Sequence, residues 1–135
     1  MDAVDIELSS KKILKDVIDA AHRFKKRVIV SYHNFNDTPE QKKLEAIIKN
    51  CRKAGGDMVK IATLVKDKKD IIRLAYLTLS KKDIITIAMG KLGTLSRVIF
   101  PMFGSLLTYS SITKSSAPGQ MPLKTAALLL KELKK

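Results

Sequence analysis

Short apolar runs alternate along the chain with longer segments in which apolar residues recur every three or four positions. The short runs predict five strands, at 3–8, 27–32, 57–65, 84–89 and 105–111. The longer segments predict helices at 13–24, 38–54, 67–79, 94–101 and from 122 onward. Strands and helices that alternate in this way, at intervals of about thirty residues, are typical of a parallel sheet built from βαβ units. We therefore expect an α/β fold.

Two architectures fit this alternation: a doubly wound open sheet and part of a (βα)8 barrel. A complete barrel takes about 250 residues and eight βα units. This chain has 135 residues, so it could supply only a partial barrel of about five units. Its length and its 45% hydrophobic content suit one globular domain that spans 1–135.

Several features of the sequence indicate a cytoplasmic protein without a membrane partner. No apolar run approaches the roughly 20 residues that a membrane-spanning helix needs. The first residues lack the basic and apolar segments of a signal peptide. Cys51 is the only cysteine and cannot form an internal disulfide. It lies in a helical pattern with apolar neighbours, which indicates a small core residue rather than a nucleophile.

The net charge of +13 and the pI near 9.9 would suit a nucleic-acid binder or a protein that attracts anionic substrates. The lysines are scattered over the outer faces of the predicted helices, and no basic block alternates with aromatic residues. We therefore expect a solvated basic surface and no nucleic-acid partner. A non-catalytic basic module that binds nucleic acid remains an alternative, and it rests on the charge alone.

The run 57–65 carries one lysine, Lys60, among β-branched and apolar residues. Neighbours alternate across a strand, so Met58, Lys60 and Ala62 share one face. A lysine on a strand that is covered on both sides loses hydration, which favours the neutral, nucleophilic amine that imine formation with a ketone or aldehyde requires. The alternative is an ordinary lysine that extends to water from an edge strand.

Polar residues gather where the predicted strands end, and in parallel α/β folds these ends form the site. A histidine beside an imine-forming lysine can remove the proton next to the imine. An arginine at a helix start can hold a carboxylate by a two-point contact. The polar residues at these ends are His33, Lys60, Lys91, Arg97, Ser116 and Gln120.

Four short motifs follow one another along nearly the whole chain. They are Ser31-Tyr32-His33-Asn34-Phe35 with Thr38-Pro39, Val59-Lys60-Ile61-Ala62, Met89-Gly90-Lys91-Leu92-Gly93 with Ser96-Arg97, and Ser116-Ala117-Pro118-Gly119-Gln120. In order and spacing they resemble the motifs of type I 3-dehydroquinate dehydratase. That family is a (βα)8-barrel lyase of the shikimate pathway, in aromatic amino-acid biosynthesis. It dehydrates 3-dehydroquinate to 3-dehydroshikimate through an imine.

The resemblance implies a role for each matching position. Lys60 matches the lysine that forms the imine with the substrate ketone, and His33 matches the general acid/base. Arg97 matches the arginine that holds the substrate carboxylate. Ser116 and Gln120 match the loop that closes over the bound ring, while Phe35 and Met89 match the pocket wall. No metal or nicotinamide cofactor is implied, and the sequence has neither a cluster of Cys and His ligands nor a GxGxxG motif.

The resemblance begins at the family's fourth strand and covers strands 4 to 8. The family's first three units, with the acidic partner of the histidine and further substrate-binding residues, therefore have no counterpart here. We expect a truncated or partial gene product with at most weak activity on its own, and its open edges leave a homodimer possible. An imine-forming lyase of the aldolase type remains the alternative within enzymes.

Overall fold

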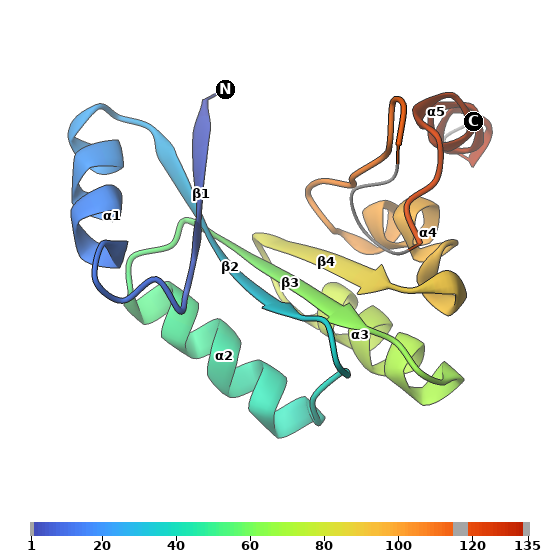
Figure 1. The fold of residues 1–135 in the computed structure, drawn as a ribbon, viewed down its shortest axis with the longest axis horizontal. Coiled ribbons are helices and arrows are strands. Elements are labelled where there is room, and N and C mark those ends of the chain that lie inside the picture. Colours follow the sequence, from blue (N-terminus) through green and yellow to red (C-terminus); the bar gives the residue numbers. More distant parts are fainter. Residues whose placement is uncertain (1, 115–118, 134–135) are drawn as a thin grey trace.

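The computed structural model describes residues 2–114 and 119–133. In this part of the chain four strands form one parallel sheet in the order β1-β2-β3-β4, so that neighbours in sequence are neighbours in space. The strands are β1 (Ala3–Glu7), β2 (Arg27–Asn34), β3 (Met58–Leu64) and β4 (Ile84–Met89). Figure 1 shows this sheet, with β1 and β4 at its two edges. The α/β prediction is confirmed.

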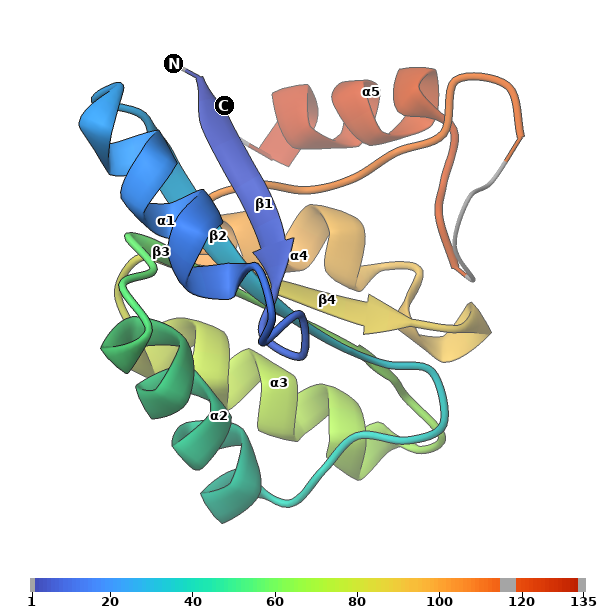
Figure 2. The same ribbon diagram turned by 60° about the vertical axis from the view of Figure 1, so that its left-hand side comes forward.

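A helix follows each of the first three strands, as in repeated βαβ units. These helices are α1 (Leu14–Arg23), α2 (Gln41–Lys53) and α3 (Lys68–Ser80). After β4 come a short 3-10 helix η1 (Lys91–Gly93), α4 (Ser96–Phe103) and α5 (Leu123–Leu133). Figure 2 shows α2 and α3 side by side along one face of the sheet, with α5 on the other side of the sheet. Helix α4 follows β4 and packs against α3, since Phe100 shares a buried cluster with Leu74 and Leu77.

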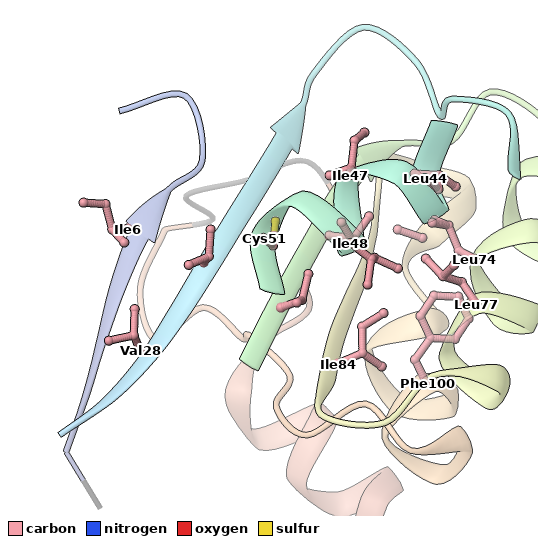
Figure 3. Close-up of a cluster of buried hydrophobic side chains, with 14 of the residues drawn as sticks. Ile6, Val28, Leu44, Ile47, Ile48, Cys51, Leu74, Leu77, Ile84 and Phe100 are labelled. Atoms are coloured by element: carbon pink, nitrogen blue, oxygen red, sulfur yellow. The ribbon is translucent and has the colours of Figure 1, made fainter. Parts of the chain in front are cut away.

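Alternation along the strands divides the apolar side chains between the two faces of the sheet. On β3, Val59 and Ile61 belong to the large cluster that packs against the helices, part of which is drawn in Figure 3. Met58 and Ala62 belong to a smaller cluster on the opposite face, together with side chains of β2 and β4. Lys60 lies two residues from both Met58 and Ala62. Because side chains alternate along a strand, its side chain leaves the sheet on the same face as theirs, away from α1, α2 and α3.

Cys51 lies on the buried side of α2, within the large cluster (Figure 3). Burial, with a smaller contribution from the negative charge of Glu7, raises the pKa of its thiol to about 12. Because the thiolate is the reactive form, this thiol is inert at neutral pH. The sequence-based interpretation of Cys51 as a core residue is confirmed.

The predicted fifth strand at 105–111 is wrong. This segment joins β4 through one backbone hydrogen bond, from Leu106 N to Ile84 O at 2.9 Å, and its other pairing is an isolated bridge between Ser111 and Pro122. The Ser105 hydroxyl accepts from Thr86 N at 3.0 Å and donates to Leu107 O at 3.0 Å. A side chain therefore satisfies backbone groups that a strand ladder would otherwise pair.

Helix α4 was predicted to begin at Thr94 and to end near Pro101, but it continues through Pro101 to Phe103. A proline inside a helix leaves the carbonyl four residues earlier without its partner, here the carbonyl of Arg97. Thr108 Oγ1 donates to that oxygen at 2.7 Å and compensates for the loss. The helix ends at Gly104, whose φ of 114° is a left-handed conformation that favours glycine.

Helix α2 begins at Gln41 rather than at the predicted Thr38, because residues 38–40 are held by β3 and α3 instead. Thr38 Oγ1 donates to Leu64 O at 2.8 Å. Arg73 of α3 donates to Thr38 O at 3.2 Å and Pro39 O at 3.3 Å, and it pairs with Asp70 and Glu40. The guanidinium of Arg73 is therefore surrounded by acceptors.

Asp57 joins three segments at the opposite end of the sheet, where the strands begin. Its Oδ2 lies 2.9 Å from His22 Nε2 of α1 and accepts from Val28 N of β2 at 2.8 Å. Partial burial alone would raise the pKa of this carboxyl. The hydrogen bonds from His22 and Val28, with the positive charges of His22 and Arg27, outweigh burial and lower the pKa below its ordinary value.

We expect Asp57→Asn to lower the free energy of unfolding at neutral pH by about 1 kcal/mol, a value kept small because the carboxylate is partly hydrated. A carboxyl whose folded pKa is depressed stabilises the protein above its ordinary pKa and loses that contribution as the pH falls below it. Urea unfolding at about pH 6 and about pH 3 should therefore show a smaller difference from wild type at the acidic value. Asp16→Asn, at an exposed position of α1, is the control. An Asp57→Asn difference that stays constant with pH would contradict this account.

Candidate active site

A cavity of about 230 Å³ lies on the face of the sheet away from α2 and α3. It is bounded by β2, β3, β4 and α4, and by the segment 105–114. The carboxyl ends of β2 and β4 contribute to it, which is where parallel α/β folds place their sites. Its lining residues are His33, Phe35, Lys60, Ala62, Ile87, Met89, Arg97, Tyr109 and Gln120.

Lys60 projects into this cavity from the interior strand β3, and its side chain is only 12% exposed. The interpretation as an ordinary lysine that extends to water from an edge strand is therefore wrong. Its Nζ donates to Asp5 Oδ2 at 3.0 Å and lies 4.6 Å from the centroid of the Tyr109 ring. An anion and an aromatic face thus hold the amine within the cavity.

His33 lies near the end of β2, and its side chain is 29% exposed. Its Nδ1 lies 2.6 Å from Glu7 Oε2, and its ring stacks on Phe35 with centroids 6.0 Å apart. His33 and Lys60 line the same cavity, on adjacent strands. The structure therefore brings a possible nucleophile and a possible proton carrier to one site.

Arg97 reaches the cavity from the second residue of α4 and is only 2% exposed. Among the residues that the structure describes, its Nε and Nη2 have no hydrogen-bond partner. Burial lowers the pKa of this guanidinium below its ordinary value. A buried cation without an anion is costly, so this corner of the cavity favours an anionic group of a ligand.

The remaining sequence candidates fall into three groups. Phe35, Met89 and Gln120 line the cavity. Lys91 is exposed in η1 and is not among the lining residues. Ser116 lies outside the described residues.

Asp5, Glu7 and Tyr109 contact the candidate groups but were not chosen from the sequence. The resemblance places the family's acidic partner of the histidine in units that have no counterpart here, and in this chain a carboxylate of β1, Glu7, contacts His33. The parallel pairing of β1 with β2 places Glu7 opposite Ser31, two residues before His33 on the same face. The alternation of Asp5 and Glu7 on the first predicted strand was the available signal. For Tyr109 there was none, because its segment was assigned to a strand.

Within 2–114 and 119–133, no three His, Cys, Asp or Glu side chains are grouped so that they could hold a metal ion. No helix in these ranges has the length and apolar character needed to cross a membrane.

The strand order β1-β2-β3-β4 never reverses, and α1, α2 and α3 pack on one face of the sheet while the pocket lies on the other. This arrangement defines the chain as an α/β protein built like part of a (βα)8 barrel rather than a doubly wound sheet. The comparison with protein families is more specific. The model of type I 3-dehydroquinase matches residues 1–135, and the chain belongs to this family.

Individual relatives agree with this assignment. The chain is 40% identical to the 3-dehydroquinate dehydratase of Methanococcoides burtonii over 124 residues, which cover 91% of this chain and 53% of that protein. It is 38% identical to the Pyrococcus abyssi enzyme of the same name over 130 residues, which cover 96% and 60%. The chain therefore spans little more than half the length of these relatives.

Solved structures show the same partial coverage. The 3-dehydroquinate dehydratase of Geobacillus kaustophilus matches with a TM-score of 0.91 and 32% identity, over 99% of this chain and 54% of that one. The enzyme of Aquifex aeolicus matches with a TM-score of 0.90 and 35% identity, over 99% and 61%. The described elements are thus one part of the family's barrel.

Proposed function

We propose that this chain carries the imine-forming part of a 3-dehydroquinate dehydratase site, a hydro-lyase of the shikimate pathway. The observation that carries the proposal is that Lys60, His33 and Arg97 line one cavity. Together they supply an amine for the ketone, a base for the proton and a cation for the carboxylate of 3-dehydroquinate. The family and the names of the relatives support this choice of substrate.

The reaction would begin when the Lys60 ammonium gives one proton to His33 and the resulting amine adds to the ketone carbon. His33 would return that proton to the former ketone oxygen, which takes a second hydrogen from the nitrogen and leaves as water, so that one hydrogen stays on the imine nitrogen. The resulting protonated imine draws electrons from the neighbouring carbon, so that its C–H bond becomes acidic enough for an imidazole. His33 takes that proton, and the electron pair forms a carbon–carbon double bond as the hydroxyl on the next carbon leaves. His33 returns the proton to the hydroxyl, which departs as water. A final water molecule hydrolyses the imine and frees Lys60.

The other residues would orient the ring. Arg97 would hold the carboxylate, and Phe35 and Met89 would form the wall of the cavity. Gln120 lines the cavity and would contact the polar face of the ring. Ser116, in the same loop sequence, would join it in closing over the substrate.

Further parts of the proposal concern the chain as a whole. Residues 1–135 would form one domain that corresponds to strands 4 to 8 of the family's barrel, in a cytoplasmic protein whose partner is this anionic small molecule.

The scattered lysines of the chain argue against a nucleic-acid partner, while homodimerisation stays a prediction. Because the chain spans about half of its relatives, we expect the 135-residue chain alone to turn over slowly.

Reductive trapping tests the proposed chemistry. The purified chain is incubated with 3-dehydroquinate and borohydride, whose hydride converts the imine to a stable amine, and the labelled peptide is identified by mass spectrometry. We expect one adduct, on the peptide that contains Lys60. An adduct with simple aldehydes but not with 3-dehydroquinate would instead indicate the aldolase type, and labelling spread over surface lysines would refute the proposal.

A further inference from the structure

We infer that Glu7 is a positioning residue that fixes the tautomer and the orientation of His33, so that Nε2 serves as the base toward the substrate. The inference rests on the function proposed above. Glu7 is not among the residues that line the cavity, whereas His33 is. Glu7 therefore acts on the reaction only through the imidazole.

Three hydrogen bonds hold Glu7 and the end of β2 together. Glu7 Oε2 lies 2.6 Å from His33 Nδ1 and accepts from Ser31 Oγ at 3.3 Å. Glu7 Oε1 accepts from His33 N at 3.3 Å. One carboxylate thus contacts both the ring and the backbone of the same histidine. These contacts restrict the rotation of the ring and determine which ring nitrogen carries the hydrogen.

The charge of Glu7 determines which ring nitrogen carries the hydrogen. An ionised carboxylate can only accept, so Nδ1 must be the donor at 2.6 Å. In a neutral imidazole the lone pair then lies on Nε2, which is the nitrogen that can take a proton. The stacking of the ring on Phe35, which also lines the cavity, fixes the ring plane beside the substrate space.

The two acidic residues of β1, Asp5 and Glu7, contact different partners. Asp5 and Glu7 lie on one face of the strand, two residues apart, and each contacts one of the two candidate reacting groups. Asp5 contacts the amine of Lys60, so it cannot replace Glu7 at the imidazole. A change at Glu7 should therefore alter His33 while leaving the pairing of Lys60 in place.

The chain contains an internal reference for this inference. It has two histidines, and the other one, His22, contacts its carboxylate Asp57 through Nε2 rather than Nδ1. The structure thus predicts opposite tautomers for the two rings in one protein. His22 lies on α1, outside the cavity, so its tautomer should not respond to changes at Glu7.

The test is a nitrogen-15 NMR spectrum of the imidazoles in the uniformly labelled chain, without substrate, at about pH 8.5, where histidine is ordinarily neutral. We expect the Nδ1–H tautomer at His33 and the Nε2–H tautomer at His22. In Glu7→Ala the His33 signals should move toward the Nε2–H pattern that free histidine prefers. In Glu7→Gln they should stay near wild type, because the amide oxygen can accept the same hydrogen bond.

Unchanged His22 signals show that each variant is folded. An Nε2–H tautomer at His33 in the wild-type chain would overturn the inference, and so would an Nδ1–H tautomer that persists in Glu7→Ala. The wild-type spectrum alone is decisive if Glu7→Ala does not fold. Because no substrate is present, this result is independent of reductive trapping, so the proposed function and the role of Glu7 can fail separately.

Discussion

Replacing Lys60 by methionine should reduce borohydride-dependent labelling of the chain by 3-dehydroquinate to the background level. Among the lining residues that the structure describes, Lys60 alone carries an amine, so no other group in the cavity can form the imine. Methionine keeps most of the buried aliphatic length of lysine. The loss of its amine leaves Asp5 without this partner, but the Asp5 carboxylate is 36% exposed and stays hydrated, so the cost in stability should be below about 1 kcal/mol.

Lys91→Met is the matched control for this variant. Lys91 is exposed in η1, directly after β4, and does not line the cavity. Labelling should therefore stay at the wild-type level in Lys91→Met. If Lys60→Met were labelled as strongly as Lys91→Met, the amine that reacts would lie elsewhere and the proposed chemistry would be refuted.

Replacing Arg97 by methionine should change ligand affinity and stability in opposite directions. Loss of a charge-assisted contact to the carboxylate should weaken binding roughly 10- to 100-fold. Removal of a buried cation whose Nε and Nη2 have no partner should raise the free energy of unfolding, by about 1 kcal/mol or more. Calorimetric titration with 3-dehydroquinate reduced at the ketone measures binding without imine formation, and urea unfolding measures stability.

Arg73→Met separates this explanation from a general effect of replacing arginine. Arg73 is also largely buried, with 16% of its side chain exposed, but it is surrounded by acceptors from α3 and residues 38–40. Its loss should lower the free energy of unfolding and leave binding unchanged. Destabilisation by Arg97→Met to the same degree would show that Arg97 is a structural residue.

The strands that carry the site were predictable because their sequences are rich in apolar and β-branched residues, as a strand buried on both faces requires. Runs of β-branched and apolar residues that are buried on both faces, such as those around Lys60 and at Ile84–Met89, have few alternatives to a parallel strand. The segment 105–111 lacks such a run, and the hydroxyl of Ser105 pairs with two backbone groups. The end of α4 was also unpredictable by local rules, because Thr108 compensates for Pro101 from outside the helix.

In the site, too, the features that depend on local sequence pattern were predictable, and those that depend on tertiary contacts were not. Alternation along the strand predicted that Lys60 shares a face with Met58 and Ala62, and the parallel topology predicted that it lies near His33, as the structure shows. Their roles stay predictions. The pairing of Glu7 with His33 depends on the register between β1 and β2, which the sequence of either strand does not specify. Tyr109 reaches Lys60 from a segment without regular structure.

The most direct test of the account is a crystal structure of the chain after reaction with 3-dehydroquinate and borohydride. We expect continuous density from Lys60 Nζ to the ring carbon that carried the ketone. We also expect the carboxylate at the Arg97 guanidinium and His33 Nε2 facing the carbon next to the new bond. A ring joined to another lysine, or a Lys60 adduct whose carboxylate lies away from Arg97, would contradict this account.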